Sequence, residues 1–378
     1  MSANLLQALE ASDVTGASEK FKEEILNGRD PWEIHLSLFP VAMRVLNPPF
    51  VNAHLPKMYA ICSDLVPYLK REEVPALVQL EINEYARRPL LEKLSRPNRL
   101  PSPVSFGDVE SAIREEDWEK TAVLMAAFYE QKGGKELSRR FLLLGSGYLS
   151  DSLGHSFSCA SFILLKTTDP ANPDPWPVLT TLAHFFCKAK FHTTLPLGKS
   201  KDLREDETLY YPMVEATEGL GILRMHHTIT RYAMERARHL FSEEEYDHLI
   251  GAWTAFIEKK GEEKASPESR KTEPVTDYAR FYEIFSGHEP KAVVAALSEM
   301  IASRKGRKEL GRFLIKGLCD HYPGHYDPHC LTGLGSALWT MEQYSSRPPI
   351  PLNALFQYVD FYFSSVRSSA RPNENPIG

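Results

Sequence analysis

Almost every segment of this sequence repeats its apolar residues with the period of an α-helix. Apolar side chains recur three or four positions apart, and no run of β-branched residues alternates with a period of two. Start signals agree with this period, since Ser242 and Glu245 have the spacing of a capping box and Pro31 follows Asp30 at a helix start. The sequence therefore predicts an all-α fold. Long helices are predicted at 73–94, 117–131, 135–147 and 212–240.

Two stretches of the chain resemble each other at an offset of 173 positions. Lys135-Glu136-Leu137 recurs as Lys308-Glu309-Leu310, and the same offset carries His54 onto His227. A period this long exceeds that of solenoid repeats, so we interpret it as a duplication that gives two related halves. The alternative is a chance likeness between helices of similar composition. The expected organisation is N-terminal helices at 1–29, a first half at 30–190, a second half at 205–366 packed on the first as one globular unit, and a disordered tail at 367–378.

The offset carries His54 onto His227 and His155 to within one residue of His329, which suggests a pseudo-symmetric site of four imidazoles. His54, His155, His227 and His329 each lie at or near the start of an apolar helix, where a side chain can face the interior of a bundle. Neutral imidazole binds iron, copper and zinc, and four histidines without a thiolate suit a non-haem iron site. The alternative is four buried histidines, each with its own hydrogen-bond partner.

Hydroxyl groups follow three of these histidines at the third position. Ser158, Thr230 and Thr332 therefore share a helix face with a candidate ligand and are predicted to support its ring.

Neighbouring histidines compete for the same role. Successive residues of a helix point about 100° apart, so only one of His226 and His227 can face the site. We prefer His227 because its register matches His54. His325 and Asp327 precede the last histidine and are candidates for an additional ligand, although a solvated turn is the alternative there.

Composition excludes several classes of partner. A net charge of −6 with interspersed signs does not predict binding to nucleic acid or to anionic lipid. No apolar run is long enough for a membrane span, and the N-terminus lacks the features of a signal peptide. The five scattered cysteines include no Cys-x-x-Cys pair, so they predict reduced thiols. We therefore expect a soluble cytoplasmic protein.

Familiar catalytic motifs are absent from the sequence. It contains no glycine-rich phosphate loop, no His-Glu-x-x-His and no pair of Glu-x-x-His motifs. Aromatic residues near the proposed ligands can either line a flat substrate pocket or fill the core. They are Phe50, Tyr59, Phe157, Phe162, Tyr232, Tyr326 and Trp339.

Four short motifs, spread over about residues 30 to 345, resemble those of the questin oxidase-like family of all-α proteins. They are Asn52-Ala53-His54-Leu55-Pro56, Leu153-Gly154-His155-Ser156-Phe157, His227-Thr228-Ile229-Thr230 and His329-Cys330-Leu331-Thr332. Characterised members open a ring of fungal anthraquinones by oxygen insertion, and relatives are non-haem iron oxygenases with histidine ligands. The resemblance implies His54, His155, His227 and His329 as ligands. This chain departs from the family at Asp327-Pro328, so the resemblance assigns no fifth ligand.

These observations favour a metal-dependent oxygenase or oxidase with non-haem iron, acting on an aromatic or polyketide-like small molecule. Zinc or another divalent metal is the alternative cofactor, and zinc would indicate a hydrolase because it activates water but not dioxygen. The remaining hypothesis is a non-catalytic helical binding or scaffold protein.

Overall fold

The chain is folded almost entirely into helices. The computed structural model describes residues 3–168, 174–191, 206–258, 275–287 and 289–369. Within these ranges the only extended pairing is a pair of isolated β-bridges, so the predicted all-α class is confirmed.

The α-helices have the following bounds. They are α1 (Ala3–Glu10), α2 (Val14–Leu26), α3 (Pro31–Ser37), α4 (Phe39–Ala42), α5 (His54–Leu65), α6 (Val74–Ala86), α7 (Phe106–Arg114), α8 (Trp118–Ser146), α9 (His155–Leu164), α10 (Trp176–Ala189), α11 (Asp206–Thr217), α12 (Ile222–Ala237), α13 (Glu243–Glu258), α14 (Tyr278–Ser286), α15 (Pro290–Ile301), α16 (Arg304–Asp320), α17 (His329–Gln343) and α18 (Ile350–Ser369). Short 3-10 turns are η1 (Val66–Tyr68), η2 (Arg71–Glu73), η3 (Leu165–Thr168) and η4 (Arg238–Leu240).

Local sequence explains where several helices begin. Ser242 and Glu245 form the predicted capping box at the start of α13, with N–H to side-chain distances of 3.0 and 3.2 Å in the two directions. The side chain of Asp30 caps α3 by accepting from the N–H of Trp32.

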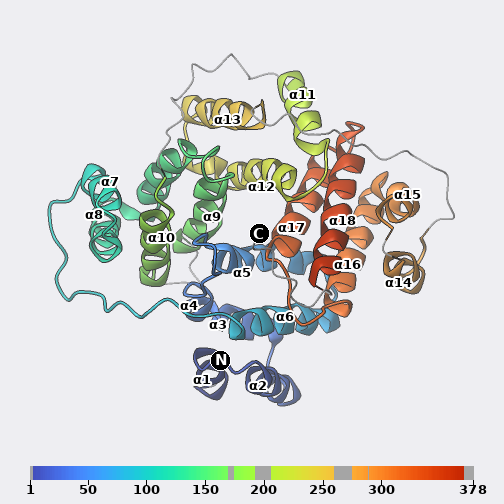
Figure 1. Ribbon diagram of the computed structural model, residues 1–378, viewed down its shortest axis with the longest axis horizontal. Coiled ribbons are helices and arrows are strands. Elements are labelled where there is room, and N and C mark those ends of the chain that lie inside the picture. The colour runs from blue at the N-terminus through green and yellow to red at the C-terminus, as the bar shows by residue number, and fades with distance from the viewer. Residues whose placement is uncertain (1–2, 169–173, 192–205, 259–274, 288, 370–378) are drawn as a thin grey trace, which may run out of the picture.

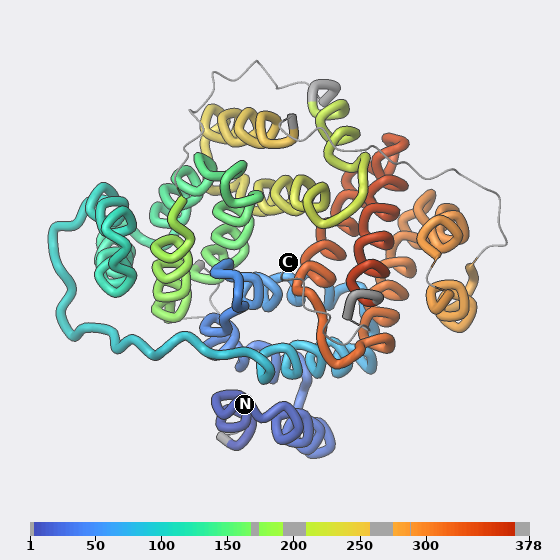
Figure 2. The backbone as a smooth tube through the Cα atoms, viewed as in Figure 1, coloured from blue at the N-terminus to red at the C-terminus, as the bar shows by residue number. Residues whose placement is uncertain are grey.

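Glycines with positive φ explain where the helices differ from the predicted segments. The predicted helix 212–240 is divided into α11 and α12, because Gly219 and Gly221 adopt φ values of +105° and +84°. The predicted helices 117–131 and 135–147 are joined into α8, which is kinked at Gly133 with φ +82°. The segment predicted at 73–94 is helical only to Ala86, and Figure 2 shows the following connection running along the outside of the molecule to α7.

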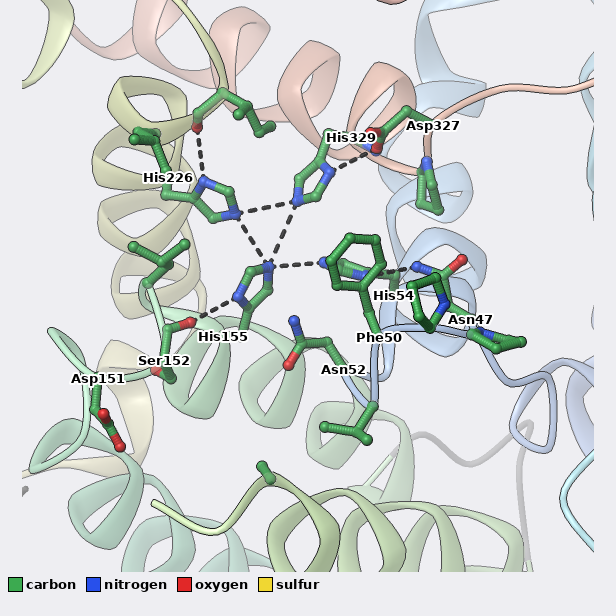
Figure 3. Close-up of a pocket in the computed structure, with 18 of the residues that line it drawn as sticks. Asn47, Phe50, Asn52, His54, Asp151, Ser152, His155, His226, Asp327 and His329 are labelled. Carbon is green, nitrogen blue, oxygen red and sulfur yellow. Dashed lines mark hydrogen bonds and ion pairs between the residues drawn. The ribbon is translucent and has the colours of Figure 1, made fainter. Parts of the chain in front are cut away.

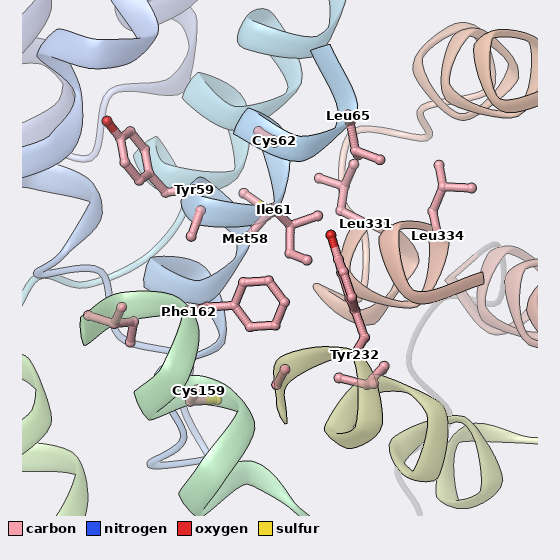
Figure 4. Packing of buried hydrophobic residues seen from close by; sticks show 14 of the residues in the cluster. Met58, Tyr59, Ile61, Cys62, Leu65, Cys159, Phe162, Tyr232, Leu331 and Leu334 are labelled. Carbon is pink, nitrogen blue, oxygen red and sulfur yellow. The ribbon is translucent and has the colours of Figure 1, made fainter. Parts of the chain in front are cut away.

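Four helices form the centre of the fold (Figure 1). α5 packs against α9 and α17, and α12 packs against the same two helices. Their facing sides are apolar: Figure 4 shows Ile61 of α5, Phe162 of α9, Tyr232 of α12 and Leu331 of α17 meeting in one buried cluster. Burial of this surface fixes the relative positions of the four helix starts.

The order of helices in the first part of the chain recurs in the second. α5, α6, α7, α9 and α10 have counterparts in α12, α13, α14, α17 and α18, while α15 and α16 correspond to the two arms of the kinked α8. Corresponding helices start 168 to 174 positions apart. This recurrence is a property of helix order, and a duplication of the sequence stays a prediction.

The ends of the chain can be compared with the expected organisation. α1 and α2 occupy the segment expected to hold N-terminal helices. α18 continues to Ser369, three residues beyond the expected end of the second half, and residues 370–378 of the expected tail lie outside the described residues. No helix in the described part of the chain combines the length and the apolar character that a membrane span requires.

Candidate metal centre

Four buried imidazoles meet where the four central helices begin (Figure 3). The Nε2 atom of His155 lies 2.7 Å from that of His54, 3.0 Å from that of His226 and 3.5 Å from that of His329. The Nε2 atoms of His226 and His329 are 3.1 Å apart. The ring nitrogens therefore form one cluster from four different helices, in which His155 contacts the other three.

Helix starts place these rings. His54, His155 and His329 are the first residues of α5, α9 and α17, and His226 is the fifth residue of α12. Side chains on a helix lean toward its N-terminus, so rings near a helix start project into the space beyond that start. Since the four starts lie together, the rings share that space.

Gly154 allows α9 and α12 to approach each other closely. This residue precedes His155 and has a φ of +78°, a backbone conformation that residues other than glycine rarely adopt. A Cβ atom at this position would lie 2.1 Å from Oγ1 of Thr230 on α12. Glycine is therefore required both by the backbone and by the neighbouring helix.

Three of the rings donate a hydrogen bond outward through Nδ1. His155 and His226 donate to the backbone carbonyl oxygens of Ser152 and Ile222, each at 2.6 Å. His329 donates to a carboxylate oxygen of Asp327, also at 2.6 Å. Carbonyl and carboxylate oxygens only accept, so the proton of each neutral ring lies on Nδ1 and its Nε2 lone pair faces the centre.

Asn47 holds the fourth ring differently. Arg88 donates a short hydrogen bond to Oδ1 of Asn47, so the amide N–H₂ of Asn47 faces Nδ1 of His54 at 3.1 Å. In this arrangement Nδ1 of His54 accepts, and its Nε2–H donates to His155. For His54 to present an Nε2 lone pair to a metal, its proton would have to move to Nδ1, which now accepts from the amide of Asn47.

Burial disfavours the charged form of three of the rings. Loss of hydration, followed by the charges of neighbouring imidazoles, holds the pKa of His54, His155 and His226 well below 6.5. Burial by itself would raise the pKa of Asp327, but the hydrogen bonds and electrostatic interaction with His329, together with the charge of Arg88, lower it, so that this side chain is a carboxylate. Neutral imidazole is the form that binds metals.

The spacing of the nitrogens suits a cation. Four nitrogens at about 2.0–2.1 Å from a tetrahedral metal are separated by about 3.3 Å. The distances from His155 to the other three rings and from His226 to His329, 2.7 to 3.5 Å, lie on either side of that value. The ligand atoms of His54, His155 and His329 all lie within 4.8 Å of one another, with His226 beside them. This buried cluster could therefore bind a metal ion.

The preference for His227 over His226 is corrected by the structure. His226 faces the cluster, whereas the ring of His227 packs edge-on against Phe256, with 4.9 Å between the ring centroids. Its backbone oxygen accepts from the indole of Trp253. The offset of 173 comes from the Lys-Glu-Leu helices, which are distant from these histidines. The separation between corresponding helix starts varies by several residues along the chain. At an offset of 172, His54 matches His226.

The remaining predicted site residues lie nearby in other roles. Asp327 contacts the outer nitrogen of His329 and thus supports a candidate ligand, while His325 is half exposed, 3.7 Å from a carboxylate oxygen of Glu84. Both line the pocket beside the cluster.

The three hydroxyls predicted to support the rings are buried, but they do not hold ring nitrogens. Ser158 accepts a hydrogen bond from Lys57, and no hydrogen bond joins Thr230 or Thr332 to a ring among the described residues. The rings reach backward past their helix starts, so their partners precede them in the sequence, whereas these hydroxyls follow.

A pocket of about 820 Å³ opens onto the cluster. Its floor includes the four rings, and its walls include Phe50, Phe191 and Ile222. Among the seven aromatic residues considered from the sequence, Phe50 lines this pocket and is 61% exposed. The other six are core residues, five of them buried and Trp339 half-buried.

Sequence reasoning missed the groups that orient the rings. Asn47 and Arg88 carried no recognisable motif, and the carbonyl oxygens of Ser152 and Ile222 have no side-chain signal at all. Comparisons with protein-family models, curated proteins and solved structures found no match to this chain.

Proposed function

We propose that this protein is a metal-dependent oxygenase or oxidase, with a redox-active metal such as non-haem iron held by His54, His155, His226 and His329. The observation that carries the proposal is the gathering of four buried imidazoles whose outer nitrogens are largely fixed by hydrogen bonds. Nitrogen ligands without a thiolate suit iron or copper as well as zinc.

The adjoining pocket supports a small, flat substrate. Phe50, Phe191 and Ile222 provide apolar walls, and Asn52 and Ser152 add polar groups close to the rings. Such walls would orient an aromatic or polyketide-like molecule and exclude water from the reacting atoms. A bound iron would supply the activation of dioxygen, while Asp327 would hold His329 in position.

The resemblance to the questin oxidase-like family points to the same chemistry. It rests on the motifs around His54, His155, His227 and His329. Of these histidines, His227 packs against Phe256, and its neighbour His226 faces the cluster. Membership of that family is part of the proposal.

Elemental analysis tests the common premise. The protein would be purified without chelators, reconstituted with ferrous iron under anaerobic conditions and assayed for oxygen consumption with hydroxylated aromatic compounds. We expect about one iron per chain and oxygen uptake that depends on the substrate. Stoichiometric zinc with hydrolytic activity would favour the hydrolase, and a protein that binds no metal would be a scaffold.

A further inference from the structure

Lys57 is a buried cation beside the histidine cluster. It lies one turn after His54 on α5, and its side chain is fully buried. Its Nζ donates to Oγ of Ser158 at 3.1 Å and lies 5.7 Å from the centre of the Phe162 ring, which Figure 4 shows between α5 and α9. No carboxylate among the described residues pairs with it. Buried ammonium groups normally have such a partner.

The groups around Lys57 are neutral. Its charge lowers the pKa of His54, His155 and His226, which places these rings within its electrostatic reach. Burial raises the pKa of the Cys159 thiol on α9 to about 11. These groups leave the ammonium without a compensating charge.

Among the described residues, no carboxylate of the other elements packed against α5 pairs with Lys57. α4 contains no titratable residue. On α6, the carboxylate of Glu81 is already bonded to His35 and Tyr85, and on α17 the ring of His329 faces the cluster. The hydroxyl of Tyr68 on η1 is neutral, because burial raises its pKa.

We propose that Lys57 releases its proton to solvent when a divalent cation binds to the four imidazoles, so that metal binding is coupled to deprotonation of this one lysine. The inference rests on the metal-binding part of the proposed function. The protein with a Lys57 ammonium and a free divalent cation becomes the protein with a neutral Lys57 amine and a bound cation, and one proton is released to solvent. No carboxylate separates the two positive charges, and the buried surroundings screen them poorly.

Deprotonation is within reach at neutral pH. Burial lowers the pKa of Lys57 to about 8, so the amine is charged at pH 7 but already close to releasing its proton. The neutral amine can still share a hydrogen bond with Ser158, because the serine hydroxyl can donate to the nitrogen lone pair. Metal binding would thus leave a proton acceptor one turn from His54.

Calorimetric titration with zinc tests the inference. Zinc is added to the metal-free full-length protein at pH 7.0 in two buffers with different heats of ionisation, which gives the number of protons released per zinc. We expect the wild type to release about 0.9 more protons per zinc than K57M. Any proton lost from zinc-bound water appears in both proteins, so the difference isolates Lys57. Methionine has a similar length and tolerates the buried position.

The matched control is K190M, which removes an ammonium that lines the pocket but pairs with Glu116. It should release as many protons as the wild type. If K57M and the wild type both bind zinc and release equal numbers of protons, the inference about Lys57 is overturned while the metal site stands. If the wild type binds no zinc, the metal site itself is wrong and the inference falls with it.

A second measurement does not depend on the variant. In the wild type, the slope of log affinity against pH should fall by about one as the pH rises through 8. A slope that does not change there would also overturn the inference.

Discussion

Asp327 accepts a hydrogen bond of 2.6 Å from Nδ1 of His329, and the same carboxylate oxygen accepts from the backbone N–H of His329 at 2.9 Å. Two contacts to one residue fix both the start of α17 and the rotation of the ring. Carboxylates that bond the outer nitrogen of a ligating histidine also increase its basicity. Asp327 was considered from the sequence as a direct ligand, and it acts instead on the far side of the ring.

Replacing Asp327 with asparagine should weaken metal binding. Asparagine keeps the size of the side chain but loses the negative charge that favours the Nδ1–H form of His329. We expect D327N to lower the affinity for zinc about 10- to 100-fold, measured by competition with a chromophoric chelator. D151N is the matched control, because Asp151 lines the same pocket without bonding one of the four rings. Equal losses in the two variants would contradict the assigned role.

Replacing Asn47 with aspartate should strengthen metal binding. The carboxylate would accept from Nδ1–H of His54 and pair with Arg88, so that Nε2 of His54 would present a lone pair to the cation as the other rings do. We expect N47D to raise the affinity for zinc about tenfold and N47A to lower it. An N47D protein that binds zinc more weakly than the wild type would show that Asn47 does not control the tautomer of His54.

Alanine substitutions of His226 and of His227 should have different effects, one on metal binding and the other on the stability of the fold. H226A removes a ring nitrogen from the cluster, so bound metal should be lost. H227A removes a ring that packs against Phe256, so the free energy of unfolding should fall by about 2–4 kcal/mol while metal is retained. Metal content and urea denaturation of both variants provide the comparison. Retention of metal by H226A together with its loss in H227A would reverse the assignment made here.

The metal-free protein should lose stability in mild acid. The pKa values of His54, His155 and His226 are depressed in the folded state, so unfolding takes up protons as the pH falls below about 6.5. Each ring lowers the free energy of unfolding by up to about 1.4 kcal/mol for each pH unit of acidification, so the three together give a slope of up to about 4 kcal/mol per pH unit. Urea denaturation between pH 7.5 and 5.5 measures it. H155Q should reduce the slope by about one ring's share, and an unchanged slope would indicate that His155 is not held neutral.

Alanine at Gly154 should be destabilising in a way that a second substitution relieves. The added Cβ would meet Oγ1 of Thr230 at 2.1 Å, and the backbone at φ +78° is itself strained for alanine. We expect G154A to lower the free energy of unfolding by about 2–4 kcal/mol. Adding T230A should recover the part due to the clash but not the part due to φ, as a double-mutant cycle would report. Strict additivity of the two substitutions would argue against a direct contact.

The sequence was sufficient for the fold class and for three of the four rings. Helical periodicity and capping residues such as Ser242 act locally, so they can be read from a short window. The choice between His226 and His227 depends on a register carried over from a distant segment, and that register fails here. Gly219 and Gly221 interrupt the predicted continuous helix, so α12 starts at Ile222. Asn47 could not be found, since its role depends on Arg88, 41 positions away.

The four helix starts that carry the rings come from widely separated parts of the chain. Even the two rings closest in sequence, His155 and His226, are 71 positions apart. No short peptide of this protein therefore contains two of the four rings of the cluster. If the cluster binds a metal, its affinity will depend on how the helices pack, because a rotation of α12 against α9 would displace His226 from the other rings while every residue of the site remained unchanged. Loss of bound metal can thus report a distant packing defect as sensitively as it reports the loss of a ligand.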